Sequence, residues 1–433
     1  VGLRIAGDVA YGLDDGLADG ALDLSTTDLA ALGAQAGTTL SGSASGRVVL
    51  SAEDGGQTVD ADLEGADLDG FGARIGSFAV DATVADALRA PQGEGRISLE
   101  DVAYEEARLE RLSFEGSAAR REGVTIAEGD LSAEGLDAFG ARIASLTAML
   151  DAEDLEGAPA ATLDAVATDL AYDPAEARVA SLRFEGRAED LAGAPSASGT
   201  LTIEDASSAG ATLARLVVEG RGETLIESPS VAMSATAEGL AYPPAEAEIG
   251  LASFEGSAED LAGAASAEGR LVLDAVQAAG AEAARIAFEG SGEDLTRAAA
   301  ARGRLTVNAL AYPGADATVE RVALDFEGTE LNGAANASGI LTASAISAAG
   351  ATASALEATF SGEGLTTETP VATLDARLSE VGAPGAASGA ATLSAALTEA
   401  EGGRLVASLS TDPIRLDAGR VGSAALDGTA TGV

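Results

Sequence analysis

One short pattern recurs along this chain of 433 residues and limits what it can fold into. In its clearest copy, Leu182 and Phe184 alternate with Arg183 and Glu185, and Gly186 follows. Alternation of apolar and polar residues is the period of a half-buried β-strand, not of a helix. Related copies run over residues 112–116, 216–220, 252–256, 286–290, 324–328 and 356–362. The sequence therefore predicts strands at regular intervals.

The strands belong to a repeat. The glycines Gly72, Gly140, Gly210, Gly280 and Gly350 open similar segments about 70 residues apart. Each such double unit divides into two halves of about 35 residues, and each half is predicted to be a hairpin of two strands. We expect Gly210, Gly280 and Gly350 to lie at hairpin turns that need positive φ. We predict irregular first β-repeats over residues 1–70 and regular hairpins over residues 71–433, in one continuous elongated domain.

Spacing within the repeats also distinguishes strands from helices. The gaps from Tyr104, Tyr172, Tyr242 and Tyr312 to the next phenylalanine in a strand differ in length, but all are even. A strand keeps its face through an even insertion, whereas a helix rotates by about 200° for every two residues added. The even gaps favour strands.

The predicted strands have one polar and one apolar face. Ile286 and Phe288 lie on one face, and Arg285 and Glu289 lie on the other. No helical pattern supplies a covering layer, so the sheet must curl onto itself or be filled by something apolar. Two interpretations of the recurrent Phe and Gly positions stay open. They form either the packed interior of a solenoid or the lining of a groove for acyl chains.

Composition excludes several classes of function. The formal charge of −45 argues against nucleic acid and against docking on anionic membranes. Only 3% of residues are aromatic, so any core is thin, and the strict alternation argues against disorder. The chain has no Cys and no His, which excludes disulfides, thiolate zinc sites and His-based catalysis.

Enzyme motifs are missing as well. No phosphate loop, dinucleotide glycine pattern or nucleophile elbow occurs. The carboxylates recur once per repeat, as expected of a solvated face, so we expect no enzyme, cofactor or metal site. Asp67 and Asp69 match a fragment of a calcium loop without its closing Glu, and Asn336 fits a glycosylation pattern. We expect neither to be used.

The start at Val1 and the lack of an apolar run of about 18 residues suggest a piece of a longer protein without a membrane span. A cysteine-free, acidic β protein suits the bacterial periplasm or cell surface.

The runs over residues 189–203 and 209–220 resemble the repeat region of the TamB family of AsmA-like proteins. The likeness covers roughly residues 40–430 and lies in the spacing of the repeated pattern and in the composition. The resemblance implies a U-shaped β-groove (β-taco) with an apolar interior, tethered in the inner membrane of a Gram-negative bacterium. It implies a periplasmic protein that conducts phospholipid to the outer membrane and aids outer-membrane protein assembly. The family's anchor helix and its C-terminal domain for an outer-membrane partner have no counterpart here.

We therefore predict an all-β, elongated array of antiparallel hairpins forming a β-groove, with a closed β-solenoid as the alternative fold. The predicted function is lipid transport, with phospholipid acyl chains as the ligand; the alternative is a structural stalk or adhesin. The residues predicted to line the groove are Leu112, Phe114, Leu182, Phe184, Leu201, Ile203, Leu216, Val218, Phe254, Leu271, Leu273, Ile286, Phe288, Leu305, Val307, Leu324, Phe326 and Phe360.

Overall fold

The fold is taken from a computed structural model. It describes residues 3–14, 16–30, 33, 39–53, 55–121, 123–226, 228–367, 370–398 and 404–431. The chain separates into two compact units, called unit 1 (Val1–Ala209) and unit 2 (Gly210–Val433). The expected boundary at residue 70 within one continuous domain stays a prediction.

Unit 1 is an antiparallel meander in which every strand pairs with the next one along the chain. Among the described residues β1 pairs with β2 alone, so the sheet is open at that edge. A register shift occurs between Ser41 and Ser43. The strands are β1 (Arg4–Tyr11), β2 (Ala18–Thr26), β3 (Leu40–Glu53), β4 (Gly56–Gly70), β5 (Ala73–Ala85), β6 (Gln92–Tyr104), β7 (Ala107–Arg121), β8 (Val124–Ala138), β9 (Ala141–Glu153), β10 (Ala160–Tyr172), β11 (Ala177–Glu189) and β12 (Ser196–Ser208).

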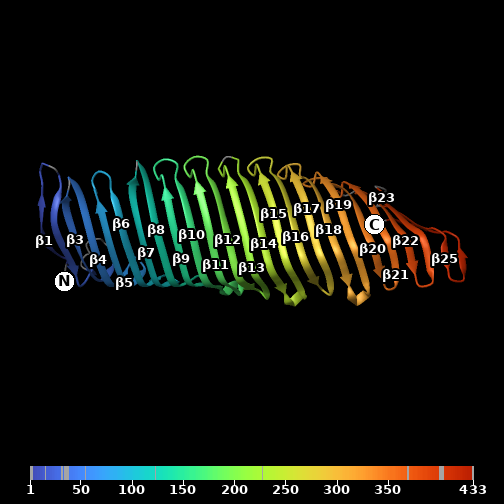
Figure 1. The fold of residues 1–433 in the computed structure, drawn as a ribbon, viewed down its shortest axis with the longest axis horizontal. Coiled ribbons are helices and arrows are strands. Elements are labelled where there is room, and N and C mark those ends of the chain that lie inside the picture. Colours follow the sequence, from blue (N-terminus) through green and yellow to red (C-terminus); the bar gives the residue numbers. More distant parts are fainter. Residues whose placement is uncertain are drawn as a thin grey trace. The chain divides into compact units, whose positions relative to one another are not determined.

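Unit 2 repeats this arrangement, and within each unit the strands lie side by side with turns at both edges (Figure 1). Its last hairpin is interrupted: β24 and β25 both pair with β23, and β27 and β26 pair with them in turn. The strands are β13 (Ala211–Glu223), β14 (Ser230–Tyr242), β15 (Ala247–Glu259), β16 (Ser266–Ala278), β17 (Ala281–Glu293), β18 (Ala300–Tyr312), β19 (Ala317–Thr329), β20 (Asn336–Ala348), β21 (Ala351–Glu363), β22 (Val371–Ala383), β23 (Ala386–Thr398), β24 (Arg404–Thr411), β25 (Ile414–Leu416), β26 (Gly419–Val421) and β27 (Ala424–Thr431).

The prediction of an all-β array of antiparallel hairpins is confirmed. The alternative of a closed solenoid is wrong, because each unit is an open sheet of strands that pair antiparallel with their neighbours in sequence. The U shape of the expected groove stays a prediction.

One edge of the sheets carries short turns of two kinds. In the first kind two residues connect the strands, as in Ala279-Gly280, where φ is 49° and 79°. Positive φ at both positions is the geometry of a type I′ turn, whose twist matches that of the strands. Gly210 and Gly350, with φ of 84° and 82°, also have the positive φ expected of them. In the second kind a 3₁₀ turn follows a tyrosine: η1 (Asp173–Ala175), η2 (Pro243–Ala245) and η3 (Pro313–Ala315).

At the opposite edge longer loops connect one hairpin to the next, and backbone hydrogen bonds join each loop to its neighbour. The N–H of Leu295 donates to the carbonyl of Ala265, and the N–H of Leu331 donates to the carbonyl of Ala299. The carboxylate of Asp260 accepts from the N–H of Ala264 within its own loop. The loops therefore satisfy their backbone groups through one another, as edge segments must when no other layer covers them.

Every second strand from β4 to β22 contains one residue with positive φ partway along its length. These kink residues are Asp67, Asp101, Gly135, Asp169 and Asp205 in unit 1, and Gly239, Ala275, Ala309, Ala345 and Glu380 in unit 2. Pairing skips them: Asp274 pairs with Arg285 and Val276 pairs with Ala283, on either side of Ala275. A left-handed residue interrupts the alternation of side chains, so a line of kinks crosses each sheet.

Candidate ligand-binding face

Strand register places the predicted lining residues of unit 2 in three neighbouring rows on one face. We call them the central row, the second row and the glycine row. The central row is Val218, Ala235, Phe254, Leu271, Phe288, Leu305, Leu324 and Leu341. The second row is Leu216, Ala237, Ala252, Leu273, Ile286, Val307, Val322 and Ala343. The glycine row is Gly220, Met233, Gly256, Gly269, Gly290, Gly303, Phe326, Gly339 and Phe360.

Unit 1 has the same rows. Its central row is Leu63, Val80, Ile97, Phe114, Leu131, Ala148, Ala165, Phe184 and Leu201. Its second row is Phe78, Leu99, Leu112, Ala133, Leu146, Ala167, Leu182 and Ile203. Its glycine row includes Gly95, Gly116, Gly129, Gly186 and Gly199.

All the predicted lining residues thus fall in these rows, although two are displaced. Phe326 and Phe360 lie in the glycine row, two residues along the strand from the central row that holds Phe254 and Phe288. The rings of Phe288 and Phe326 stack with centroids 6.3 Å apart, so aromatic contact continues from one row to the next. That these residues line a lipid path stays a prediction.

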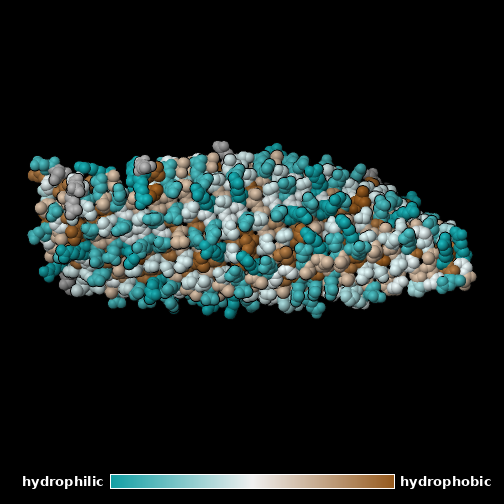
Figure 2. All heavy atoms as spheres, viewed as in Figure 1, coloured by the Kyte–Doolittle hydropathy of each residue, from teal (hydrophilic) through white to brown (hydrophobic). Residues whose placement is uncertain are grey.

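The rows are only half covered. Phe288 is 37% exposed and Phe114 is 39% exposed, and no large side chain among the described residues is fully buried. The most buried apolar residues are mostly alanines, such as Ala167 and Ala358. Figure 2 shows hydrophobic residues reaching the surface among hydrophilic ones. An apolar face of this extent is normally covered by another layer, a partner or a ligand.

Phenylalanine rings fill the space above the glycines. A Cβ added to Gly186 would lie 2.6 Å from Cζ of Phe184, two residues earlier on the same strand. A Cβ added to Gly199, its cross-strand partner, would lie 3.1 Å from Cε2 of the same ring. The pattern recurs with Phe114 above Gly116 and Gly129, Phe254 above Gly256 and Gly269, Phe326 above Gly303, and Phe360 above Gly339. The glycines therefore leave room for the rings, and each ring fills the space on the apolar face that a larger side chain would occupy at the glycine position.

Leucines of the loops cover glycines in the same way at the edge of this face. These leucines were not assigned to the face from the sequence. A Cβ added to Gly292 would lie 2.6 Å from Cδ2 of Leu295, and Gly328 has the same relation to Leu331. Leu225 above Gly222 and Leu365 above Gly362 complete the set in unit 2. The signal in the sequence is the recurrent Asp-Leu or similar pair two or three residues after a strand glycine. These leucines extend the apolar face to the loop edge.

The opposite face of unit 2 carries a charge ladder, defined as Glu255, Arg270, Glu289, Arg304 and Asp325 on five adjacent strands. The signs alternate from strand to strand, so each Arg faces a carboxylate on both sides. In unit 1 the Nη2 atom of Arg183 lies 2.7 Å from Oδ2 of Asp164 in a similar pair. Each exposed pair adds little to the stability of the fold, but a one-residue slip in register would move every charge to the apolar face.

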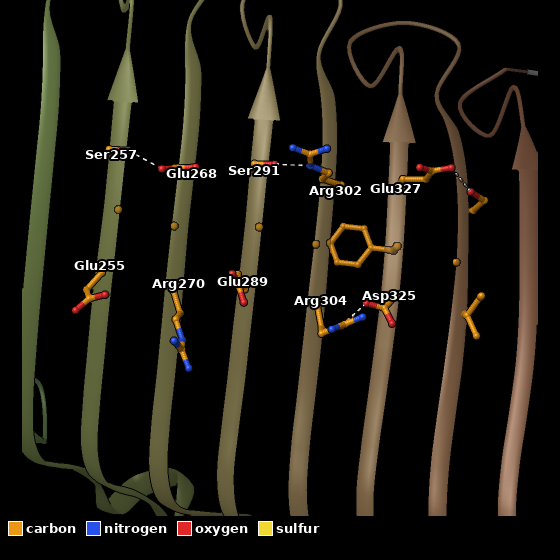
Figure 3. Close-up of a pocket in the computed structure, with 18 of the residues that line it drawn as sticks. Glu255, Ser257, Glu268, Arg270, Glu289, Ser291, Arg302, Arg304, Asp325 and Glu327 are labelled. Atoms are coloured by element: carbon orange, nitrogen blue, oxygen red, sulfur yellow. Dashed lines mark hydrogen bonds and ion pairs between the residues drawn. The ribbon is translucent and has the colours of Figure 1, made fainter.

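A hollow of about 1030 Å³ lies on this charged face of unit 2. Figure 3 shows the charge ladder on one side and a second polar row on the other, formed by Ser257, Glu268, Ser291, Arg302 and Glu327. The glycine row supplies the backbone between them, and Phe326 and Phe360 also contribute. Nε of Arg302 donates to Oγ of Ser291 at 2.9 Å. In unit 1 a smaller hollow lies between Asp81, Arg96, Glu115 and Glu128. Most of the predicted apolar residues therefore do not line these hollows.

Hydrogen bonding perturbs two groups of the ladder. The hydrogen bond from Arg304, and its positive charge, lower the pKa of Asp325 below the ordinary value. The same hydrogen bond raises the pKa of Arg304. Glu115 raises the pKa of Arg96 in the same way. These shifts stabilise the charged forms of both partners, which suits a structural ladder rather than proton transfer.

The two other motifs of the sequence have structural positions. Asp67 is a kink residue in β4, and Oδ2 of Asp69 accepts a hydrogen bond from Nε of Arg74 at 2.9 Å. Asn336 opens β20, where its Oδ1 accepts from the N–H of Gly364. Within the described ranges, no group of three or more Asp or Glu side chains is placed to hold a metal ion.

Comparisons with models of known protein families, with curated proteins and with solved structures found no match. In the part of the chain that the structure describes, no helix has the length and apolar character needed to cross a membrane.

Proposed function

We propose that the apolar face of this protein binds phospholipid acyl chains and conducts them between two membranes. The observation that supports this proposal is the alignment of the central, second and glycine rows into one half-exposed apolar surface, which no second layer of the described residues covers in either unit. Apolar surface left in water is unfavourable, and a chain of methylenes would remove it from water.

The surface has suitable dimensions for such a ligand. One leaflet's share of a bilayer's hydrocarbon core is about 15 Å, which corresponds to roughly three strand spacings of about 4.8 Å. A buried methylene contributes about 0.8 kcal/mol, and a chain that lies on an open face buries one side, so about half of that is expected per methylene. Because the rows continue from strand to strand, an acyl chain can move along them and keep apolar contacts at each step.

The resemblance to the TamB family extends the proposal. In this view the full-length protein is tethered to the inner membrane of a Gram-negative bacterium. Its apolar face carries phospholipid across the periplasm to the outer membrane and aids outer-membrane protein assembly there. The acidic, cysteine-free composition is consistent with that compartment.

The test uses neighbouring residues of β15 that point to opposite faces. A photo-crosslinking amino acid at Phe254 should capture phospholipid in cells, and the same probe at Glu255 should capture little. Phe288 and Glu289 on β17 provide a second matched pair. Equal capture at Phe254 and Glu255, or none at either, would contradict the proposal.

A charge on the apolar face gives a second readout. Phe254→Glu should reduce bound lipid, because a carboxylate among acyl chains is costly to desolvate. The fold should survive, since Phe254 lies on a half-exposed face where the carboxylate keeps some water. If Phe254→Glu instead unfolds the surrounding strands while no lipid adduct forms at Phe254, the face is a packed structural surface, as in a stalk.

A further inference from the structure

Two-residue turns that end in glycine have the same backbone in units 1 and 2 but different side chains. Two such turns of unit 1 are Phe71-Gly72 and Phe139-Gly140, with φ of 54° and 52° at the phenylalanines. In unit 2 the corresponding turns begin with Ala279 and Ala349, at φ of 49° and 48°. Alanine therefore suffices to build this turn, and the phenylalanines are not required by its geometry.

The two phenylalanines also gain little from the fold. Phe71 is 78% exposed and Phe139 is 71% exposed, which makes them two of the most exposed large apolar side chains described. A bulky residue in the left-handed region is disfavoured by contact of its Cβ with the backbone. A strained conformation combined with exposure indicates a role outside the chain, because burial offsets neither cost.

The surroundings of these turns indicate the kind of partner. The Phe71 turn joins β4 to β5 and the Phe139 turn joins β8 to β9, so they lie on one edge about four strand spacings, or ~19 Å, apart. The turn between them is Glu105-Glu106, preceded by Tyr104, which is 51% exposed. Behind the turns, Arg74 pairs with Asp69 and Arg142 pairs with Asp173, and Arg108 follows Glu106 by two residues. The two glutamates against one arginine leave the central turn with a net negative charge.

We infer that this edge of unit 1, called the phenylalanine edge and defined by Phe71, Tyr104, Glu105, Glu106 and Phe139, docks a protein that has a basic surface between two apolar pockets. Exposed aromatic residues are typical anchors of protein interfaces. The net charge of −45 attracts a basic partner, and Lys or Arg of that partner can pair with Glu105 and Glu106. A membrane fits less well, since insertion of both phenylalanines would carry the two carboxylates between them out of water. This inference does not depend on lipid transport.

Stability measurements separate a docking role from a structural one. Replacing each phenylalanine in the full chain by the residue that this turn favours, as in Phe71→Asn and Phe139→Asn, should leave the Tm unchanged or raise it. The reverse change in unit 2, Ala279→Phe, should lower the Tm or leave it unchanged. A fall in Tm of several degrees for Phe71→Asn or Phe139→Asn would show that these side chains support the fold, and would overturn the inference.

Crosslinking in cells tests the partner. Photo-crosslinkers at Phe71 and Phe139 should capture one and the same protein, whereas the matched positions Ala279 and Ala349 should not. Glu105→Lys together with Glu106→Lys should weaken capture at both positions. The captured protein, once purified, should carry a basic surface and should bind the Phe71→Ala, Phe139→Ala double variant at least tenfold more weakly, with an affinity that falls as salt rises.

Other results would overturn the inference. These are adducts with lipid, adducts with a second copy of the chain accompanied by a dimer in sedimentation analysis, or equal capture at Phe139 and Ala349. None of these results bears on lipid capture at Phe254, so failure of this inference is distinguishable from failure of the proposed function.

Discussion

Unit 1 and unit 2 place the same kink in every second strand but, apart from one glycine in each (Gly135 and Gly239), build it from different residues. Unit 1 uses Asp101, Asp169 and Asp205, whereas unit 2 uses Ala275 and Ala309 at the corresponding positions. Aspartate tolerates the left-handed conformation better than alanine does. Because the kink persists with alanine, it is imposed by the neighbouring strands and not by the residue that adopts it.

The second residue of the returning strands, the odd-numbered strands from β5 to β23, differs between the units in charge. It is Arg74, Arg108, Arg142 and Arg178 in unit 1, and Thr212, Glu248, Glu282, Thr318, Thr352 and Ala387 in unit 2. The position faces water in both units, so the sheet accepts either set of side chains. The apolar rows and their glycines are therefore common to both units, whereas the turn edge is free to differ and can carry separate functions.

The largest effect on stability is expected at the glycines beneath the phenylalanine rings, which both units share. Gly339→Ala in unit 2 should destabilise the protein by about 1–3 kcal/mol, because its Cβ would lie 2.5 Å from the carbonyl oxygen of Asp325 and 2.5 Å from the ring of Phe360. Gly116→Ala in unit 1 should cost about as much, since its Cβ would meet Phe114 and the carbonyl of Glu128. Urea denaturation measures both.

The matched control for this pair is Gly220→Ala, where the added Cβ would meet nothing within 4 Å. It should stabilise by roughly 0.5–1 kcal/mol, because glycine is unfavourable in a strand interior. If Gly220→Ala and Gly339→Ala have the same effect, the rings are not seated on the glycines as described.

A smaller effect is expected at the kinks. Ala275→Gly should stabilise unit 2 by roughly 0.5–1 kcal/mol, because glycine adopts φ of 54° without the clash that alanine makes. Ala267→Gly, earlier in the same strand, should destabilise by a similar amount. In unit 1, where Asp101 occupies the equivalent kink, Asp101→Gly should raise the free energy of unfolding by a smaller amount. A larger stabilisation at Asp101 than at Ala275 would contradict the view that aspartate tolerates the kink better than alanine does.

The smallest effect concerns the charge ladder. The lowered pKa of Asp325 means that the folded state favours its charged form, so its contribution to stability is present above the unfolded pKa of about 3.9 and is lost as pH falls through the folded pKa. Both partners are exposed, so the change in unfolding free energy should be slight. NMR titration should find Asp325 deprotonated at a lower pH than exposed aspartates, and Arg304→Gln should remove that difference. An unchanged titration in Arg304→Gln would exclude the hydrogen bond as its cause.

Much of the fold could be predicted from the alternation alone. Leu182 and Phe184 facing away from Arg183 and Glu185, repeated through the chain, was enough to assign strands, the two faces and the residues of the rows. The turn at Gly280 was also predictable, because a glycine between two alternating runs indicates a hairpin.

Other features left no recognisable signal in the sequence. Ala275 reads as an ordinary strand residue, and its kink arises from its neighbours. The alternation also does not show that the ring of Phe184 covers the glycines beside it, because the direction in which a side chain turns depends on the neighbouring strand. The division at Ala209 falls within a regular repeat and has no composition shift to mark it.

The pairing of each strand with its neighbours in sequence has a consequence for how the protein is made. From β1 to β12 and from β13 to β23 every strand pairs with the strands next to it in sequence, as when Ala317 pairs with Ala348 at the open end of β19 and β20. None of these strands has to wait for a distant segment of the chain, and only the last hairpin of unit 2 departs from this order, because β24 pairs with β27. The sheet can therefore grow during synthesis by adding one hairpin at a time to a folded edge, and the unpaired edge is occupied as soon as the next strand leaves the ribosome.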